Sequence, residues 1–248
     1  MPAFLDSHAH LADPQFDADR DAMVARARQT GAEGIVCIGE SIAAAERAAS
    51  IAAAHPGFVW STAGVHPHDA AGFDRSRDPD AIRALVAGGA VAVGECGLDY
   101  HYDHSPRERQ IAAFGAQLAL AGELDRAVVV HTREAEDDTR AMVVEAGRAG
   151  VRGILHCYTG SHALAEAALD VGWYVSFSGI VTFKRWEDDA LLRLRTARPG
   201  EPFSRTLDVE LPGPDGEALA FARRWIEALR LLRDRVPCAA LIERALER

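Results

Sequence analysis

The 248-residue chain is almost devoid of lysine, with one, Lys184, against 26 arginines. A catalytic scheme that depends on a lysine amine therefore has a single candidate position. The sequence also lacks an apolar run long enough to span a membrane, and it shows no secretory signal peptide. These absences predict a cytoplasmic protein that has no membrane partner.

Cysteine and basic charge are scarce as well. The four cysteines lie far apart, with no Cys-x-x-Cys pair, which predicts neither a disulfide framework nor a thiolate metal site. The formal net charge is −10, which argues against a broad basic surface for nucleic acid. This charge does not exclude a nuclease, because bound divalent ions supply positive charge locally.

What the chain does have is a regular alternation of short apolar runs with helical segments. Strands are expected at 4–10, 34–39, 58–65, 90–96, 127–131, 151–156 and 173–178. Helices are expected at 15–30, 41–54, 81–87, 105–121, 134–149, 161–169 and 187–195. Continuous apolar strands that alternate with helices indicate parallel strands buried on both faces. The sequence therefore predicts an α/β fold, a (β/α)8 TIM-type barrel, with residues 1–248 in one domain.

An open doubly wound sheet is the alternative fold. It is disfavoured because no Gly-x-Gly-x-x-Gly follows the first strand. The C-terminal part is atypical for either fold. Within 196–216 only 206–211 has strand character, and this weak eighth strand alternates Asp208 and Glu210 with apolar residues. Two helices, 217–233 and 238–247, are expected to follow.

Histidines and one glutamate lie at or near the ends of the predicted strands. His8 and His10 are two residues apart, so both project to one side of an extended strand. Glu95, His131 and His156 each close or follow a later apolar run. Because the active face of a barrel is formed by the C-terminal strand ends, we expect these five side chains to converge on one metal centre. Imidazole with carboxylate suits divalent ions such as zinc, manganese, cobalt or iron.

The carboxylate of Glu95 is the natural bridge between two ions, because it has two oxygens. One ion is expected to use His8, His10 and Glu95, and the other Glu95, His131 and His156. His66 and His68 follow the third strand on the same face, as substrate contacts or as exposed loop residues. His101 and His104 lie in a polar loop and are expected to be solvated.

Several segments together resemble the TatD family of metal-dependent deoxyribonucleases, within the amidohydrolase-like TIM barrels. The resemblance spans about residues 3–190 and its motifs are specific in order and spacing. The matching segments are Asp6-Ser7-His8-Ala9-His10-Leu11, Gly64-Val65-His66-Pro67-His68, Gly94-Glu95-Cys96-Gly97-Leu98-Asp99-Tyr100, Arg109-Gln110 with Phe114, Gln117-Leu118 and Leu120-Ala121, Val130-His131-Thr132-Arg133-Glu134-Ala135, His156-Cys157-Tyr158-Thr159-Gly160-Ser161, and Phe177-Ser178-Gly179-Ile180 with Phe183-Lys184.

The resemblance implies metal ligands at the same five residues: His8, His10, Glu95, His131 and His156. It further implies two divalent ions, magnesium included among the candidates, and hydrolysis of DNA phosphodiester bonds by metal-activated water. Some relatives remove D-amino acids from tRNA.

The tail, residues 196–248, departs from the family pattern. The family's eighth strand ends in an Asp that is a ligand and a catalytic residue, and no segment here reproduces its motif. The nearby acids are Asp208, Glu210 and Asp215, none in the family's context, so the catalytic acid stays unassigned and weakened activity is expected.

Two other functions stay open at the level of sequence. One is an amidohydrolase or deacylase that acts on a small amide, ester, lactone or D-aminoacyl-tRNA. Related dinuclear sites often use a carboxylated lysine as the bridge, but Lys184 follows the seventh strand and not the fourth. Glu95 in the bridging position therefore favours the phosphoesterase. The other is an inactive barrel that binds metal or nucleic acid without turnover.

Overall fold

The computed structural model describes residues 4–176 and residue 178. Seven strands form one parallel sheet in the order β1-β2-β3-β4-β5-β6-β7, so each strand pairs with its neighbours in sequence. The strands are β1 (Phe4–Ala9), β2 (Ala32–Cys37), β3 (Val59–Ala63), β4 (Ala92–Asp99), β5 (Ala127–Arg133), β6 (Gly153–Leu155) and β7 (Tyr174–Val175).

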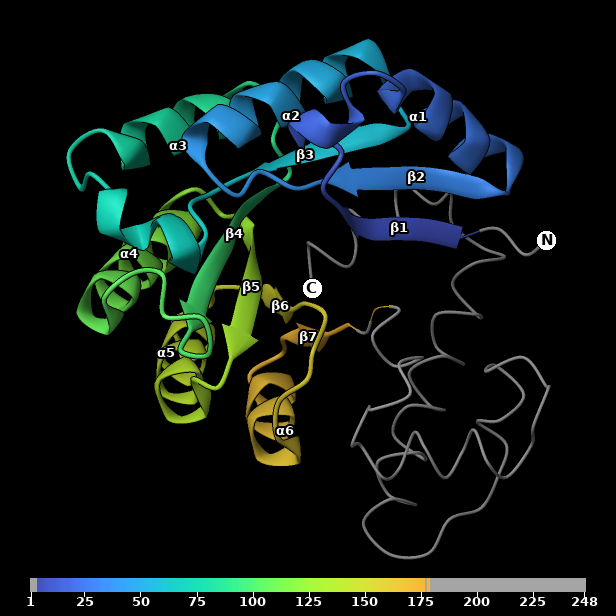
Figure 1. Ribbon diagram of the computed structural model, residues 1–248. Coiled ribbons are helices and arrows are strands. Elements are labelled where there is room, and N and C mark those ends of the chain that lie inside the picture. The colour runs from blue at the N-terminus through green and yellow to red at the C-terminus, as the bar shows by residue number, and fades with distance from the viewer. Residues whose placement is uncertain (1–3, 177, 179–248) are drawn as a thin grey trace, which may run out of the picture. The chain divides into compact units, whose positions relative to one another are not determined.

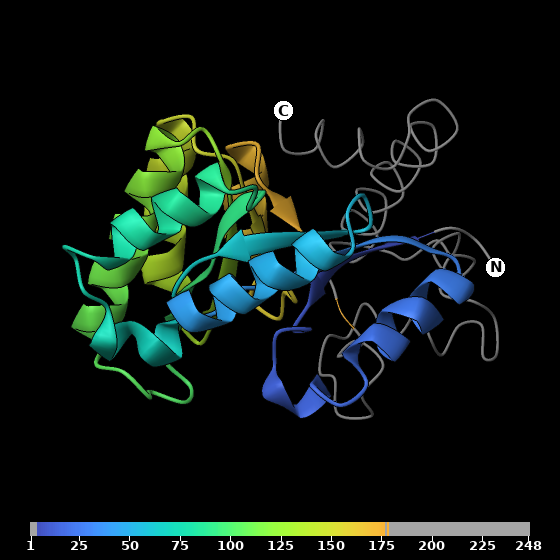
Figure 2. The same ribbon diagram turned by 90° about the horizontal axis from the view of Figure 1, so that it is seen from above.

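A helix follows each of the first six strands. These helices are α1 (Arg20–Gln29), α2 (Ile42–Ala54), α3 (Asp78–Ala87), α4 (Arg107–Glu123), α5 (Glu136–Arg148) and α6 (His162–Asp170). Figures 1 and 2 show the sheet curving, with the helices along its outer side. This arrangement confirms the predicted α/β class with TIM-barrel topology for the seven strands described. The predicted strand 206–211 and the helices 187–195, 217–233 and 238–247 lie outside the described residues, and the single domain over 1–248 stays a prediction.

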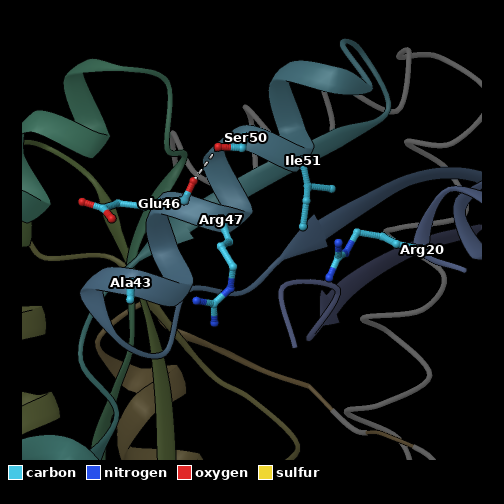
Figure 3. A pocket seen from close by; sticks show the side chains of 6 residues that line it. All are labelled: Arg20, Ala43, Glu46, Arg47, Ser50 and Ile51. Atoms are coloured by element: carbon cyan, nitrogen blue, oxygen red, sulfur yellow. Dashed lines mark hydrogen bonds between the residues drawn. The ribbon is translucent and has the colours of Figure 1, made fainter. Parts of the chain in front are cut away.

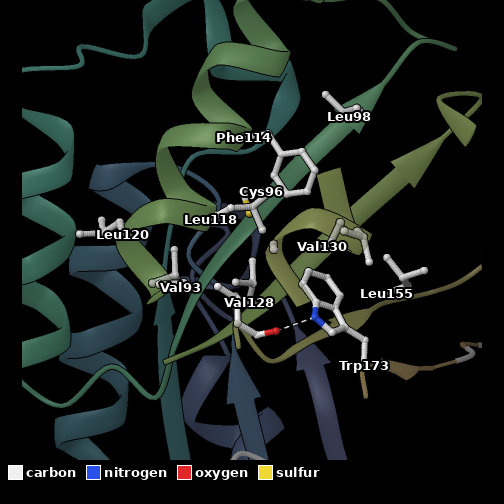
Figure 4. Close-up of a cluster of buried hydrophobic side chains, with 14 of the residues drawn as sticks. Val93, Cys96, Leu98, Phe114, Leu118, Leu120, Val128, Val130, Leu155 and Trp173 are labelled. Carbon is white, nitrogen blue, oxygen red and sulfur yellow. Dashed lines mark hydrogen bonds between the residues drawn. The ribbon is translucent and has the colours of Figure 1, made fainter. Parts of the chain in front are cut away.

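The main core lies between the outer face of the sheet and helices α3 to α6. Phe114 of α4 is fully buried in it, as are Val93 and Val128 of the sheet (Figure 4). Trp173 also packs in this core, and its indole Nε1 donates a hydrogen bond to the carbonyl of Val151 at 2.7 Å. Burial of such large side chains contributes roughly 1.5–3 kcal/mol each. This packing fixes β4, β5 and β6, the strands that carry much of the site.

Several element bounds differ from those expected. The helix expected at 15–30 is a 3₁₀ turn, Pro14–Phe16, followed by α1 from Arg20, because the Asp13 side chain caps Gln15 and begins a separate turn. The helix expected to begin with Pro106 at its first position begins at Arg107, with Pro106 extended as the N-cap residue. A second 3₁₀ turn, Pro67–Gly72, follows β3 and was not expected. Among residues 4–176 and 178, no helix combines the length and apolar character needed to cross a membrane.

Candidate metal centre

The predicted strand ends do meet at one edge of the sheet. His8 lies in β1, and His10 follows the strand directly, with 3.2 Å between their two Nε2 atoms. The Asp6 side chain accepts a hydrogen bond from the His8 amide at 3.1 Å, which folds the end of β1 locally. The expectation that the two imidazoles project together is thus met, although His10 is already outside the strand.

Glu95 lies at the centre of the imidazoles. It is 2% exposed and lies inside β4. This strand continues four residue pairs beyond Glu95, to Asp99, along β5, so Glu95 is not at the end of the strand, where it was expected. Its Oε2 lies 3.2 Å from Nε2 of His8 and 3.8 Å from Nε2 of His10. Its Oε1 lies 2.6 Å from Nε2 of His156 and 3.5 Å from Nδ1 of His131. The two carboxylate oxygens therefore divide the histidines into the two pairs expected from sequence.

A different grouping results from mutual closeness alone. Two sets of three residues, each with ligand atoms within 4.8 Å of one another, are His8, Glu95 and His156, and His66, Glu95 and His131. The rings of His8 and His156 are stacked, 3.8 Å between centroids and 1° between planes. A nitrogen lone pair lies in the plane of its ring, so two parallel rings direct their lone pairs side by side and not at one point. The division by carboxylate oxygen is the better guide to which residues share an ion.

Several nitrogen and oxygen atoms of this cluster have no hydrogen-bond partner among the described residues, and they are suited to be ligands of a divalent cation. Glu95 Oε2 and His156 Nε2 lie close to other groups of the cluster, but neither makes a hydrogen bond. Within the part of the chain that the structure describes, the buried atoms without a hydrogen-bond partner also include Nδ1 of His156 and Nδ1 of His8. Buried polar atoms are rarely unpaired, because each costs roughly 1–3 kcal/mol. A carboxylate together with imidazoles is also a ligand set of borderline divalent ions. The residues present thus fit metal binding, as the sequence predicts.

Two carboxylates outside the cluster orient its histidines. Nε2 of His131 donates to Asp99 Oδ2 at 2.9 Å, which leaves Nδ1 facing Glu95. Nδ1 of His10 lies 3.1 Å from Glu40 Oε2, which leaves Nε2 facing the cluster. A carboxylate that holds the far nitrogen of a metal-ligating histidine is a common arrangement, because it fixes the tautomer. Sequence reasoning missed both acids, although Asp99 belongs to one of the matched motifs.

His66 is a fifth imidazole at the centre, with Nε2 3.6 Å from Glu95 Oε1. Its Nδ1 accepts the backbone N–H of His68 at 3.2 Å, so in the neutral ring Nε2 carries the proton. His66 therefore presents a hydrogen-bond donor to the centre and not a lone pair. His68 contacts Asp99 and not Glu95, with Nε2 3.2 Å from Asp99 Oδ2.

Burial and charge set the protonation of these groups. Burial opposes ionisation of Glu95, but the adjacent His156, His131 and His8 hold the pKa of this carboxyl well below its usual range. Burial lowers the pKa of His66 to about 4 and also lowers the pKa of His156. Burial opposes protonation of His131 too, but hydrogen bonds to Asp99 and Glu95 raise its pKa to about 9. The centre therefore combines an ionised carboxylate with imidazoles of very different basicity.

Two buried glutamines of α4 fix the strand ends beneath the site. Gln117 accepts the backbone N–H of Val65 at 2.8 Å and donates to the carbonyl of the same residue at 3.0 Å. Gln110 does the same for Asp99, at 2.8 and 3.0 Å. Each glutamine amide thus makes the two backbone hydrogen bonds that a neighbouring strand would otherwise make to that residue. His66 and Asp99 are positioned by these contacts, which explains the two glutamines of the matched motif.

A surface groove lies between α1 and α2 (Figure 3). Arg47 donates from Nε to the carbonyl of Ala12 at 3.0 Å, and Arg20 donates from Nε to the carbonyl of Leu11 at 2.6 Å. The two guanidinium groups hold the segment that follows His10. None of the described residues that line the groove is a histidine of the site, so the groove is not part of the metal centre. Its two arginines contribute indirectly, because they hold the segment that follows His10.

Comparison with known proteins identifies the family. A family model described as TatD related DNase matches residues 5–199. The chain belongs to the TatD family. The matched stretch ends close to residue 196, where the sequence begins to depart from the family pattern.

TatD relatives share most of the length of this chain. The 3'-5' ssDNA/RNA exonuclease TatD of Edwardsiella piscicida is 37% identical over 203 residues, 82% of this chain and 76% of the relative. The uncharacterized metal-dependent hydrolase YabD of Bacillus subtilis is 38% identical over 181 residues, 72% of this chain and 70% of the relative. The solved structure of YJJV, a TatD homologue from Escherichia coli, superposes with a TM-score of 0.67 at 25% identity, covering 98% of this chain and 94% of that one. The resemblance to TatD hydrolases and the TIM-type fold are confirmed, and this TatD-family chain is a metal-dependent hydrolase.

Proposed function

We propose that this TatD-family chain hydrolyses phosphodiester bonds of DNA with two divalent ions, and that it acts in the cytoplasm. The observation that carries the proposal is the position of Glu95, whose two oxygens face different pairs of imidazoles. Such a carboxylate is suited to bridge two ions about 3.5–4 Å apart, the arrangement of many phosphoesterases. The names of relatives extend the expected substrates to single-stranded DNA and RNA.

The proposed ligands of one ion are His8, His10 and Glu95 Oε2. Those of the other are Glu95 Oε1, His131 through Nδ1, and His156. The tautomers support this assignment, because Glu40 and Asp99 hold the far nitrogens of His10 and His131. Magnesium, manganese, zinc, cobalt and iron all remain candidates for the metal.

The chain's own residues would contribute binding and orientation to hydrolysis. When bound, divalent ions lower the pKa of water and offset the negative charge of a phosphate. His66 points a neutral Nε2–H toward the same space, where it would donate to a phosphate oxygen. Asp99 and Glu40 hold two ligand rings in place, and α4 holds the strand ends. The acid of the family's eighth strand stays unassigned, with Asp208, Glu210 and Asp215 as candidates outside the described residues.

The test combines metal analysis with two substrate classes. Protein purified without chelator and loaded with manganese is expected to hold two ions and to cleave DNA oligonucleotides. Glu95→Gln should lose both ions and the activity, because the bridge is neutralised. Exposed Glu123→Gln is the matched control and should behave as wild type. Less than one equivalent of metal after loading would overturn the two-ion centre.

The same preparations separate the alternatives. Turnover of amides, esters or D-aminoacyl-tRNA without cleavage of oligonucleotides would favour the amidohydrolase. Tight metal binding without turnover of either class would favour the inactive barrel. Equal nuclease activity in wild type and His131→Ala would show that the hydrolysis does not come from this site.

A further inference from the structure

The loop between β4 and α4 carries an exposed aromatic ring beside the metal centre. Tyr102 is 51% exposed, which makes it the most exposed large apolar side chain among the described residues. The Arg133 guanidinium carbon lies 4.7 Å from the centroid of its ring, and Arg133 Nη1 lies 3.4 Å from its hydroxyl oxygen. A guanidinium over one face stiffens the ring, and the rest of the ring stays open to solvent.

The position of this ring is tied directly to the site. The backbone N–H groups of His101 and Tyr102 donate to Asp99 Oδ1 at 3.0 and 2.9 Å. Oδ2 of the same carboxylate accepts from His131 and His68. One buried acid therefore holds both the exposed ring and a proposed metal ligand. The ring of His68 lies between them, 5.6 Å from the ring of Tyr102 and 6.3 Å from that of His131.

Further rings extend the exposed surface. His104 lies 4.4 Å from His68 and 5.7 Å from Tyr102 between ring centroids. His104 is exposed, as expected, and it also packs against these two rings. His101 pairs with Glu134 at 2.6 Å. No ion pair among the described residues neutralises Arg133, so its positive charge is available to a ligand at the mouth of the site.

We propose that Tyr102, backed by Arg133 and flanked by His104, is a stacking platform for the nucleobase next to the phosphate that the metal centre hydrolyses. This inference rests on the proposed function and names a subsite for its substrate. Aromatic rings with nearby arginine are how proteins hold single-stranded nucleic acid with little dependence on sequence. The net charge of −10 gives little long-range attraction for a polyanion, so stacking on this platform would add affinity that overall charge does not supply.

The test compares binding of an oligonucleotide with and without bases. The probe is a fluorescent, phosphorothioate-linked deoxythymidine decamer, which resists hydrolysis, beside a decamer with abasic sites at its 3' end. Tyr102→Ala is expected to weaken binding of the first about 5- to 150-fold, the effect of roughly 1–3 kcal/mol per stacked base. Binding of the abasic decamer should not change. Tyr102→Phe and Tyr102→Trp should retain affinity, and Phe4→Ala, which removes an exposed ring elsewhere, should match wild type.

The outcomes separate this proposal from the proposed function. Equal losses on both decamers, or no loss on either, would overturn the platform while leaving nuclease activity to be judged by cleavage. Base-dependent binding without cleavage would support the platform and count against the nuclease. Failure of the wild-type protein to bind either decamer would overturn the platform as well as nucleic acid as the substrate.

Discussion

At the scale of the residue, the site depends on acids that touch histidines and not only on the histidines. Asp99 is fully buried and accepts hydrogen bonds from two imidazoles and two backbone amides. Its bond to His131 Nε2 keeps Nδ1 of the same ring directed at Glu95. Loss of that contact frees the ring to rotate and to exchange tautomers.

We therefore expect Asp99→Asn to weaken metal binding about 10- to 100-fold, the usual effect of losing such a partner. Titration of metal-free protein with manganese or zinc measures it, independently of turnover. Asp125→Asn is the control, because the Asp125 side chain is 91% exposed and pairs with Arg152, which is not a residue of the centre. Unchanged affinity in Asp99→Asn would mean that His131 needs no partner or is not a ligand.

At the scale of the element, β4 and β5 approach each other unusually closely beside Glu95. Gly97 has a φ of +130°, and a Cβ at this position would overlap the backbone carbonyl of His131. Gly89 has a similar φ of +117°, but a Cβ there would meet nothing within 4 Å. At both positions a side chain would be held in a strained backbone conformation. Only at Gly97 would its Cβ also clash with a neighbouring strand.

Gly97→Ala is accordingly expected to be more destabilising than Gly89→Ala. The strained backbone alone costs about 1–3 kcal/mol, and the clash adds to it by pushing β5 away from β4. Urea unfolding measures the difference, and metal titration tests its consequence. Gly97→Ala should lose metal affinity because His131 moves, and Gly89→Ala should keep it. Equal stability and equal affinity in the two variants would contradict the close approach.

Element order and the site's main residues were accessible from the sequence for clear physical reasons. The spacing of apolar residues and the breaks between apolar runs predict the strands and helices. Polar residues at the ends of apolar runs are easy to identify as candidates for the site. Glu40, Asp99 and the donor role of His66 were not accessible, since they depend on which nitrogen each ring presents. The bounds of β4 were also missed, because the glycine after Glu95, Gly97, suggests a turn, whereas in the structure it allows two backbones to pack closely.

At the scale of the whole molecule, metal should contribute to folding stability. A buried carboxylate and two imidazoles with unpaired buried atoms gain partners when ions bind, and the unfolded chain has no such site. At an ion concentration 100 times the dissociation constant, binding adds about 2.7 kcal/mol per site. For a chain of this size that corresponds to roughly 5–10 °C in Tm per site.

Thermal unfolding with manganese and with chelator measures this effect. We expect Tm to fall on chelation and to recover when manganese is restored. In Glu95→Gln the two curves should coincide, because the bridge is gone. A wild-type Tm that does not respond to metal would show that the centre is not loaded in the folded protein.

We expect the tail, residues 196–248, to determine the rate of hydrolysis. In the family pattern an acid after the eighth strand assists the attacking water, and general-base help of this kind contributes about 10²–10⁴-fold to the rate. The sequence places Asp208, Glu210 and Asp215 in that region, none in the family's context, and the family match ends at residue 199. Because the five proposed ligands are all present, we expect slow hydrolysis and not silence. A manganese-supplemented nuclease assay of wild type beside Asp208→Asn, Glu210→Gln and Asp215→Asn tests this. A further loss in one variant would identify the substitute acid, whereas a fast wild type unaffected by all three changes would show that the acid lies elsewhere in the chain or that the reaction proceeds without one.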